Sequence, residues 1–393
     1  MKLATRMGRL GTETAFEVLV RAKALEAQGR DVVHLEIGEP DFDTPANVID
    51  AGCDALRSGW THYGPSGGDP ALRQAIADYL NRSRGTGYGP DNIVVTPGGK
   101  PIMFFVILAL LEAGDEAIYP NPGFPIYESM INFTGAAPVP SPLREGKAFA
   151  LDVEELATLI TPRTKLLIIN SPGNPTGGVL IREDLQAIAE LAVKHDLIVL
   201  ADEIYSEVLY EGEHHSIATM PGMAERTIIL DGFSKTYAMT GWRLGYGAMP
   251  IEFAGQIAKL MVNSVSCTSV AVQRAGVAAL TGPQDEVRAM VEAFRRRRDL
   301  IVDGLNAIPG ISCLRPKGAF YVFPNISGTG LSSRQFADCL LNEHGVAGLA
   351  GTAFGQYGEG YLRLSYANSE ANLTKALERI EAAARGSSQH AVN

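Results

Sequence analysis

The sequence predicts an α/β protein with a mostly parallel central sheet in a large domain, followed by a smaller α+β domain. Short apolar runs rich in β-branched residues recur between residues 92 and 232, and helical segments lie between several of them. The alternation of strands and helices ends after about residue 282, where a long amphipathic helix is followed by a strand. The 393 residues, 46% of them hydrophobic, are enough to build a large core divided between two domains.

The expected strands of the large domain are, in chain order, residues 92–95 (NIVV), 116–119 (EAIY), 165–170 (KLLIIN), 197–202 (LIVLAD) and 227–232 (TIILDG). Helices are expected at 101–114 and 182–195, between strands of this set. Alternation of this kind is typical of a parallel sheet covered by helices on both faces.

The remaining segments are assigned to the small domain. A helix is expected over 283–305 and a strand over 318–323, and the helical segment 14–29 is expected to return and pack on them. The predicted division is therefore an N-terminal arm and part of the small domain at 1–44, the large domain at 45–282, and the small domain at 283–393. The tail 386–393 (GSSQHAVN) is expected to be disordered.

Composition excludes several classes of function. The formal net charge of -10 argues against a nucleic-acid surface, which needs clustered Lys and Arg, and the run RRRR at 295–298 is expected to be a solvated helix face. No apolar stretch approaches the length of a membrane span, and the first residues contain no apolar signal core, so the cytoplasm is the expected location. The four cysteines lie far apart without a CxxC pair, so neither a metal site nor a disulfide framework is predicted.

Polar loops follow four of the expected strands directly. They are TPGGK (96–100), SPGNPTGG (171–178), ADEIY (201–205) and DGFSK (231–235). Open α/β sheets form their ligand crevice at the carboxyl ends of parallel strands. The four loops are therefore expected to meet around one crevice.

Each loop on its own has an ordinary structural explanation. Gly98 and Gly99 before Pro101 make a tight turn into a helix whose free N–H groups suit a phosphate, but a purely structural turn has this sequence too. Asn174 before a proline is common turn chemistry. Asp202, at the end of a buried strand, needs a cation or donor, and a structural ion pair is as good an explanation as a functional one.

Lys235 and Arg243 favour a functional explanation of these loops over a structural one. A lysine in an apolar crevice has a lowered pKa, and its neutral amine can form a Schiff base. Arg243 can bind a phosphate through its guanidinium fork. A carboxylate, an amine, an arginine and a phosphate-binding turn match the aldehyde, ring nitrogen and phosphate of pyridoxal 5'-phosphate (PLP).

At these residues the sequence resembles a known family. Residues 234–246 (SKTYAMTGWRLGY) are similar to the S-K-x5-G-x-R lysine signature of the fold-type I, class I/II PLP-dependent aminotransferases. Further family segments match in the family's order: GEPDFDTP (38–45), THYGPSGG (61–68), NSPGNPTGG (170–178), ADEIYSEVLYEGEHH (201–215) and YLRLSYA (361–367). The resemblance covers residues 5 to 380, and its nearest subgroup is the prokaryotic aspartate and broad-specificity aminotransferases.

The resemblance implies roles around the cofactor ring. Lys235 would form the Schiff base and then move the substrate's α-proton. Asp202 would keep the pyridine nitrogen protonated, Tyr205 and Asn174 would hydrogen-bond the ring oxygen, and Phe124 would stack on the ring.

It also implies how the phosphate and substrate are bound. Gly99 and Lys100 by their backbone N–H groups, Ser234 by its hydroxyl and Arg243 by its guanidinium would hold the phosphate. Tyr63 would reach the phosphate of a neighbouring subunit, which implies a homodimer with composite active sites.

Arg363 would bind the substrate α-carboxylate beside Gly38 and Asn174, and Lys100 is placed to reach a distal carboxylate. The implied reaction is ping-pong transamination between an L-amino acid and a 2-oxo acid, with aspartate or glutamate (2-oxoglutarate) as one partner. Phe124 stands where many aspartate-type relatives have tryptophan, so specificity for aromatic or other amino acids stays open.

Two alternatives outside transamination also remain. A PLP-dependent carbon-sulfur lyase uses the same lysine, aspartate and arginines. A PLP-sensing transcription factor would need an N-terminal DNA-binding domain, whereas GEPDF begins here at residue 38.

Overall fold

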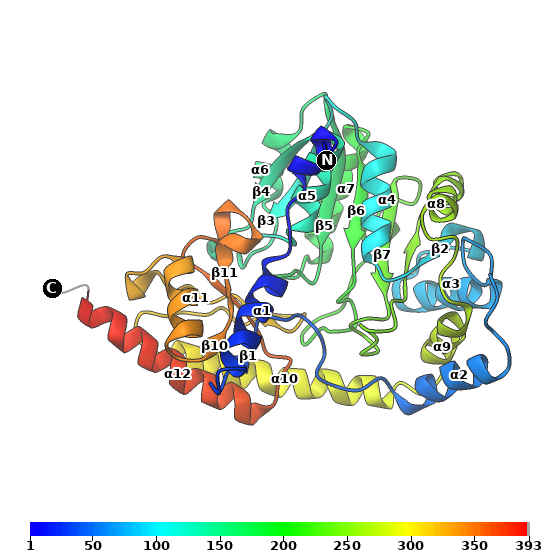
Figure 1. Ribbon diagram of the computed structural model, residues 1–393. Coiled ribbons are helices and arrows are strands. Elements are labelled where there is room, and N and C mark those ends of the chain that lie inside the picture. Colours follow the sequence, from blue (N-terminus) through cyan, green and yellow to red (C-terminus); the bar gives the residue numbers. More distant parts are fainter. Residues whose placement is uncertain (391–393) are drawn as a thin grey trace.

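A seven-stranded, mostly parallel sheet forms the centre of the large part of the molecule (Figure 1). The computed structural model describes residues 1–390 and the side chains of residues 1–386. In spatial order the strands are β2 (Ile93–Thr96), β8 (Gly245–Ala248), β7 (Thr227–Gly232), β6 (Ile198–Asp202), β5 (Thr164–Asn170), β3 (Glu116–Asn121) and β4 (Ala137–Pro142). The five strands predicted from the sequence are all present.

The strands β4 and β8 were missed, and their compositions explain why. β4 reads APVPSP, and proline cannot donate to a ladder; β4 lies at the sheet edge, where proline is tolerated. β8 reads GYGA and runs antiparallel to both of its neighbours, β2 and β7. The glycines of β8 gave no strand signal.

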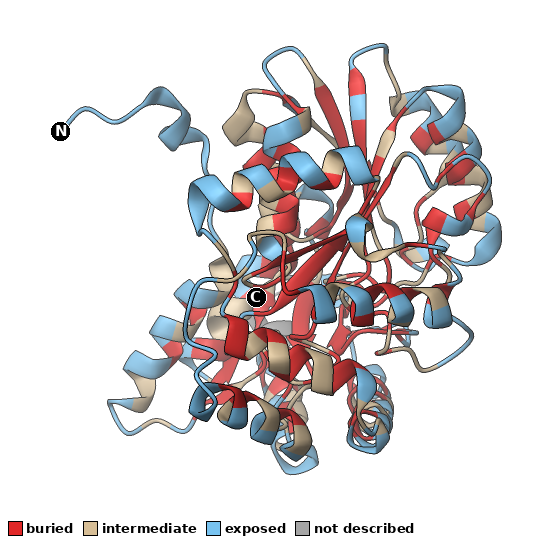
Figure 2. Cartoon of the chain, turned by 90° about the vertical axis from the view of Figure 1, so that its right-hand side faces the viewer, coloured by how far each residue is buried: buried red, intermediate tan, exposed pale blue. Residues whose placement is uncertain are grey.

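Helices cover both faces of the sheet, as predicted. Leu166 and Ile168 of β5 pack with α4, α5 and α8, whereas Leu167 and Ile169 pack with α6 and α7 on the other face. The buried strands therefore form a central layer between exposed helix surfaces (Figure 2). The helices of this part are α2 (Ala46–Arg57), α3 (Pro70–Arg84), α4 (Lys100–Leu110), α5 (Ile126–Thr134), α6 (Val153–Leu159), α7 (Arg182–Lys194), α8 (Ile251–Ser264) and α9 (Val270–Thr281).

The smaller α+β part combines two small sheets with four helices. Its elements are α1 (Thr14–Glu26), β1 (Val33–His34), α10 (Asp285–Asn306), β9 (Tyr321–Val322), α11 (Ser333–Asn342), β10 (Val346–Ala347), β11 (Leu349–Ala350), β12 (Leu362–Ser365) and α12 (Glu370–His390). β1 pairs with β10 in parallel, and β11, β12 and β9 form an antiparallel sheet. Val18 and Ala22 of α1 pack with Leu341 and Ala347, so the N-terminal helix does return to this part, as expected.

Two local expectations were wrong. The predicted disordered tail is helical as far as His390, and residues 391–393 lie outside the described chain. The RRRR run is not wholly a solvated face, because Arg298 is buried and paired with Glu211 and Asp299. The guanidinium of Arg297 lies 4.8 Å from the centroid of the Phe42 ring and binds Asp41.

The domain boundaries at 44/45 and 282/283 stay a prediction. The helix α9 ends at Thr281 and α10 begins at Asp285, so these two helices lie on either side of the second boundary.

Among the described residues no helix is both long and apolar enough to span a membrane. The short 3₁₀ helices of the described chain are Thr5–Arg9, Pro90–Asn92, Glu145–Lys147, Ile217–Thr219, Ser327–Thr329, Gly351–Phe354 and Gln356–Gly358.

Candidate active site

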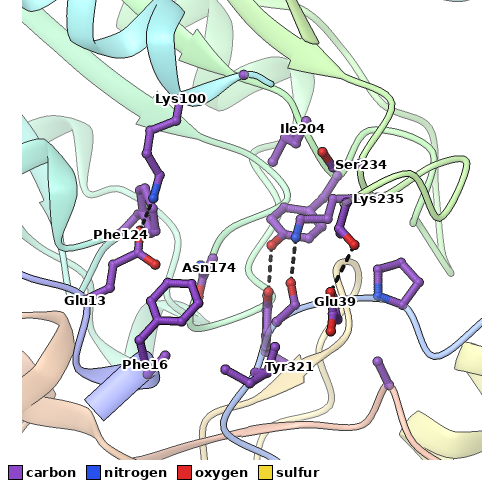
Figure 3. Close-up of a pocket in the computed structure, with 18 of the residues that line it drawn as sticks. Glu13, Phe16, Glu39, Lys100, Phe124, Asn174, Ile204, Ser234, Lys235 and Tyr321 are labelled. Carbon is purple, nitrogen blue, oxygen red and sulfur yellow. Dashed lines mark hydrogen bonds and ion pairs between the residues drawn. The ribbon is translucent and has the colours of Figure 1, made fainter. Parts of the chain in front are cut away.

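A cavity of about 860 Å³ opens at the carboxyl edge of the central sheet, where the sheet faces α1 and the small part (Figure 3). Eleven of the twelve predicted site residues line it: Gly38, Gly99, Lys100, Phe124, Asn174, Asp202, Tyr205, Ser234, Lys235, Arg243 and Arg363. The twelfth, Tyr63, lies outside this lining and is 89% exposed. The structure therefore brings together loops that follow β2, β3, β5, β6 and β7.

The antiparallel return of β8 explains why Lys235 and Arg243 reach the same cavity. Gly232 at the end of β7 pairs with Gly245 at the start of β8. Lys235 lies just beyond the first strand and Arg243 just before the second, so both ends of the connection meet at the sheet edge. The strand missed from the sequence is thus the one that positions the arginine.

Lys235 is a half-buried lysine that lines the cavity. Its Nζ donates to the carbonyl of Gly38 at 2.5 Å, and it lies 6.0 Å from the ring centroid of Tyr205 and 5.9 Å from that of Phe320. Burial, together with the nearby cations Arg363 and Arg243, lowers the pKa of Lys235 to about 8. More of the neutral, nucleophilic amine is therefore present near neutral pH than for an ordinary lysine.

Asp202 ends β6 inside the cavity and is a buried carboxylate. Burial raises the pKa of Asp202 to about 6, even though two groups donate hydrogen bonds to it. The Tyr127 hydroxyl donates to Oδ2 at 2.5 Å, and the Ile204 N–H donates to Oδ1 at 3.3 Å. No cation pairs with Asp202 among the described residues, so a cationic ring nitrogen fits as its partner.

The turn between β2 and α4 provides a place for an anion. α4 begins at Lys100 after Gly99, with no side-chain cap and no acidic residue in its first turn, so its free N–H groups remain available. Gly98 has a φ of +91°, and a Cβ there would lie 2.3 Å from Nη2 of Arg243. Glycine thus lets the guanidinium lie against the turn.

Arg363, on β12, lines the cavity and has one unused donor. Its guanidinium lies 4.6 Å from the Tyr321 ring centroid and 5.0 Å from that of Phe354, donates to the Glu36 carbonyl, and donates to Asn174 Oδ1 at 3.4 Å. Its Nε is buried and has no hydrogen-bond partner within the described part of the chain. A substrate carboxylate would satisfy this donor.

Two tyrosines form the floor beside Lys235. The hydroxyls of Tyr205 and Tyr321 are 2.7 Å apart, and burial raises the pKa of both. A Cβ on Gly38 would lie 2.1 Å from the Tyr321 hydroxyl, so only glycine fits at that position. Tyr321 was missed as a site residue because its segment, GAFYVF, looks like an ordinary strand.

Other site residues were missed for similar reasons. Tyr127 follows Phe124 by three residues, and their ring centroids lie 5.7 Å apart. The separation of three residues was the one feature of the sequence that could have indicated that Tyr127 lies beside Phe124. Glu13 and Phe16 also line the cavity, from the segment that begins α1, and Glu13 forms an ion pair with Lys100. Nothing in the sequence places this distant segment in the cavity.

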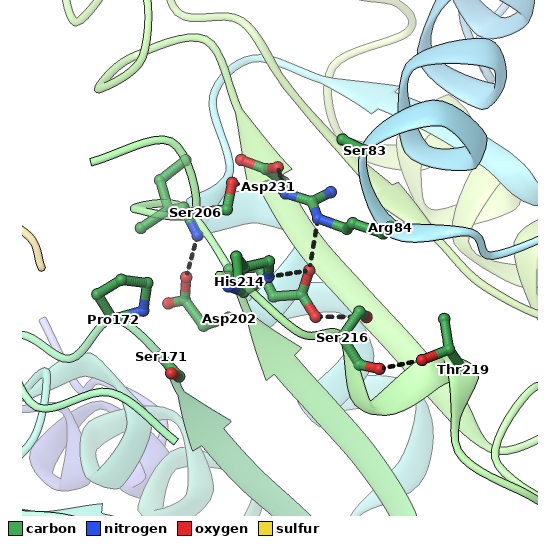
Figure 4. A network of polar contacts seen from close by, with 12 residues as sticks. Ser83, Arg84, Ser171, Pro172, Asp202, Ser206, His214, Ser216, Thr219 and Asp231 are labelled. Carbon is green, nitrogen blue, oxygen red and sulfur yellow. Dashed lines mark hydrogen bonds and ion pairs between the residues drawn. The ribbon is translucent and has the colours of Figure 1, made fainter. Parts of the chain in front are cut away.

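A buried charge cluster lies behind Asp202 and was not predicted (Figure 4). Arg84, at the end of α3, contacts Glu203 Oε2 through Nε at 2.9 Å and Asp231 Oδ2 through Nη2 at 2.6 Å. His214 contacts Glu203 at 3.1 Å. Although burial raises the pKa of Glu203, Arg84 and His214 bring it below its usual value. Arg84 is thus paired with Glu203 and Asp231 and does not line the cavity.

The donor set fits PLP at each of its functional groups. Lys235 could supply the amine, Asp202 the anion for the ring nitrogen, and the start of α4 with Arg243 the phosphate site. Phe124 supplies an aromatic face in the same cavity.

Comparisons with known proteins agree with this chemistry. The family model described as aminotransferase class I and II matches residues 30–380. An arginine–pyruvate transaminase from Pseudomonas aeruginosa is 42% identical, with 93% of each chain covered. An aromatic-amino-acid aminotransferase from Thermococcus litoralis is 41% identical, with 97% of this chain and 98% of the relative covered.

A solved structure is equally similar. The aspartate aminotransferase from Thermus thermophilus, solved with maleate, superposes with a TM-score of 0.93 at 42% identity, covering 98% of this chain and all of the other. The architecture is therefore that of fold type I. The chain belongs to the class I and II aminotransferases, which transfer an amino group between an amino acid and a 2-oxo acid with PLP as their cofactor.

Proposed function

We propose that this aminotransferase uses glutamate or aspartate as one partner of a ping-pong cycle and a 2-oxo acid such as 2-oxoglutarate as the other. One observation carries the proposal: two separate cations, Arg363 and Lys100, line the same cavity, and a dicarboxylic substrate has two carboxylates to bind. The similar Thermus enzyme was solved with maleate, which is a dicarboxylate.

The roles that we propose for the side chains follow from their positions. Arg363 binds the α-carboxylate through its guanidinium, with Asn174 and Gly38 beside it. Lys235, freed from its bond to the Gly38 carbonyl, takes the α-proton and returns it at the end of the transfer. Bound PLP supplies the electron sink for this proton transfer.

The other groups hold the cofactor in our proposal. Asp202 keeps a proton on the ring nitrogen, and Tyr205 donates to the ring oxygen together with Asn174. Phe124 packs on the ring. The phosphate is bound by the backbone N–H groups of Gly99 and Lys100 at the start of α4, by Ser234 and Arg243 from the connection between β7 and β8, and by Tyr63 from a partner subunit of a homodimer.

Lys100→Met tests the choice of substrate. Loss of a charge-assisted hydrogen bond from a half-exposed lysine should lower kcat/KM for glutamate and aspartate by about ten-fold. Phenylalanine, which has no distal carboxylate, should change by less than about two-fold on the same reasoning. Steady-state kinetics with the three amino acids decide the matter: an equal loss for all three would mean that Lys100 serves the cofactor and does not select the substrate.

A second candidate substrate class is supported by Phe16 and Phe124, which both line the cavity. They offer apolar surface to an aromatic side chain, and the Thermococcus relative is an aromatic-amino-acid aminotransferase. Aromatic amino acids are therefore proposed as further substrates of the same site.

The cytoplasmic location stays a prediction from the sequence.

A further inference from the structure

Lys100 already holds a carboxylate in this structure. Its Nζ forms an ion pair with Oε1 of Glu13, the residue that precedes α1, as Figure 3 shows. The two side chains reach the pair from opposite sides of the cavity, Lys100 from the start of α4 and Glu13 from the N-terminal segment. Lys100 Nζ also lies 5.5 Å from the centroid of the Phe124 ring.

The pair is asymmetric in its exposure. The Glu13 side chain is 16% exposed, whereas that of Lys100 is 47% exposed. Glu13 is therefore the more enclosed partner of the pair, and both residues line the cavity in which a substrate side chain would lie. Within the described residues, Lys100 is the only cation paired with Glu13.

The other cations on this wall have partners of their own. Lys23 pairs with Glu26, and His34 contacts both Glu26 and Glu36. Of the acids that line the cavity beside them, Glu39 accepts a hydrogen bond from Thr240 and Asp41 pairs with Arg297. Lys100 and Glu13 are thus the two charges that an arriving side chain would meet together.

An acidic and a neutral substrate meet this pair differently. A distal carboxylate is chemically equivalent to the Glu13 carboxylate, so it finds Lys100 neutralised and a like charge beside it. It gains the lysine only by displacing Glu13. A neutral aromatic side chain can lie against Phe16 and Phe124 while the ion pair stays closed.

We propose that Glu13 is a specificity-determining residue that acts as an internal competitor for Lys100. It occupies the lysine when the distal site is empty or holds a neutral side chain, and the distal carboxylate of an acidic substrate displaces it. Glu13 thereby lowers the affinity for acidic ligands and lets one cavity serve both classes. The inference rests on the proposed use of Lys100 as the distal-carboxylate ligand.

Binding of two unreactive carboxylates to the holoenzyme tests the proposal. Maleate carries two carboxylates and 3-phenylpropionate carries one, and each dissociation constant is measured from the change in absorbance of the bound PLP. Glu13→Gln should bind maleate roughly three- to ten-fold more tightly, between the effect of a surface ion pair and that of a buried charged hydrogen bond. Its affinity for 3-phenylpropionate should stay within about two-fold, since the phenyl group of this ligand offers no charge to Lys100 or Glu13.

Two controls complete the design. Glu17→Gln removes an acidic residue from the same helix that is exposed and does not line the cavity, so it should change neither constant. In a Lys100→Met background, Glu13→Gln should no longer tighten maleate binding selectively, because the lysine for which the two carboxylates compete is gone.

The outcomes separate this inference from the proposed function. If Lys100→Met weakens maleate but Glu13→Gln leaves it unchanged, or weakens both ligands equally, Glu13 only supports the cavity wall and the inference is overturned. If Lys100→Met leaves maleate binding unchanged, Lys100 does not bind the distal carboxylate. The proposed function is then wrong, and the proposed role of Glu13 is wrong with it.

Discussion

At the scale of single residues, Asp202 shows how a buried acid is prepared for a cationic partner. Burial, together with the neighbouring acids Asp231 and Glu203, raises its pKa to about 6. Without a cation beside it, the ionised form is disfavoured in the folded chain but not in the unfolded chain. The cofactor-free protein is therefore destabilised by Asp202 wherever this carboxyl is ionised.

The substitution Asp202→Asn is expected to stabilise the cofactor-free protein while disabling the enzyme. A folded pKa raised from 3.8 to about 6 gives stability that is present below pH 4 and lost as the pH rises through 6. At pH 8 the Asn variant should be more stable by about 2 to 3 kcal/mol, and the difference should disappear below pH 4. Urea unfolding of the cofactor-free proteins at several pH values measures this.

Catalysis by the same variant should fall by orders of magnitude, since a neutral amide cannot keep the ring nitrogen protonated. Asp54→Asn, at an acid whose side chain is 73% exposed, is the matched control and should alter neither quantity. Equal stability of Asp202→Asn and the unmutated protein at pH 8 would show that Asp202 is not strained by burial.

At the scale of secondary-structure elements, Arg84 ties α3 to β7 and to the end of β6. Its side chain is 1% exposed and contacts Glu203, Asp231 and, at 2.6 Å, the Ser206 hydroxyl. Burial raises the pKa of Asp231, and Arg84 counters that rise. The cluster supports the strand ends that carry Asp202 and Lys235.

Arg84→Met should lower the free energy of unfolding by about 3 to 5 kcal/mol, because the buried carboxylates of Glu203 and Asp231 lose the arginine that they share. Their folded pKa values should then lie above the unfolded ones, so the loss should be larger at pH 8 than at pH 5. Urea unfolding at both pH values is the measurement. Arg57→Met, at a pair whose side chains are 76% and 73% exposed, is the control; a similar small effect at Arg84 would contradict a supporting role.

The same scale shows what the sequence could and could not predict. Five strands of the central sheet were visible because their apolar runs are short, β-branched and followed by polar loops. β4 and β8 were invisible because proline and glycine dominate them, and their places are set by neighbouring strands.

The site follows the same logic. Lys235, Asp202 and Arg243 lie within motifs at strand ends, so the local sequence predicts that they meet. Glu13 and Tyr321 reach the cavity through the folding of distant segments, so no local sequence pattern predicts their positions. The same holds for Arg84, which reaches Glu203 through the packing of α3.

At the scale of the whole molecule, the loop between α2 and α3 presents aromatic side chains to solvent. Tyr63 is 89% exposed and Trp60 is 37% exposed, with the Arg274 guanidinium 3.7 Å from the Trp60 ring centroid. An exposed tyrosine in a segment that resembles the family's phosphate-binding motif supports the proposed homodimer.

Mixed dimers test whether Tyr63 serves a partner's site. In a heterodimer of Tyr63→Phe and Lys235→Ala subunits, action in trans leaves one site with both defects and one with neither. Such heterodimers, isolated with two different affinity tags, should therefore have about half the activity of the unmutated dimer, since one of the two sites is intact. Lys235→Ala homodimers should be inactive; heterodimer activity at only half the Tyr63→Phe level would mean that the tyrosine acts within its own subunit.

The position of α1 separates the evolution of substrate choice from that of the chemistry. The groups proposed to act on the cofactor come from the loops of the central sheet, whereas Glu13 and Phe16 come from the segment that begins α1 and packs on the small part. Because Lys235 and Asp202 lie in strand loops far from this segment in the sequence, substitutions near residues 13–16 can alter which side chains are accepted while leaving proton transfer intact. A short N-terminal stretch exchanged between relatives of different preference should carry part of that preference with it, so new specificities can arise without passing through an inactive enzyme.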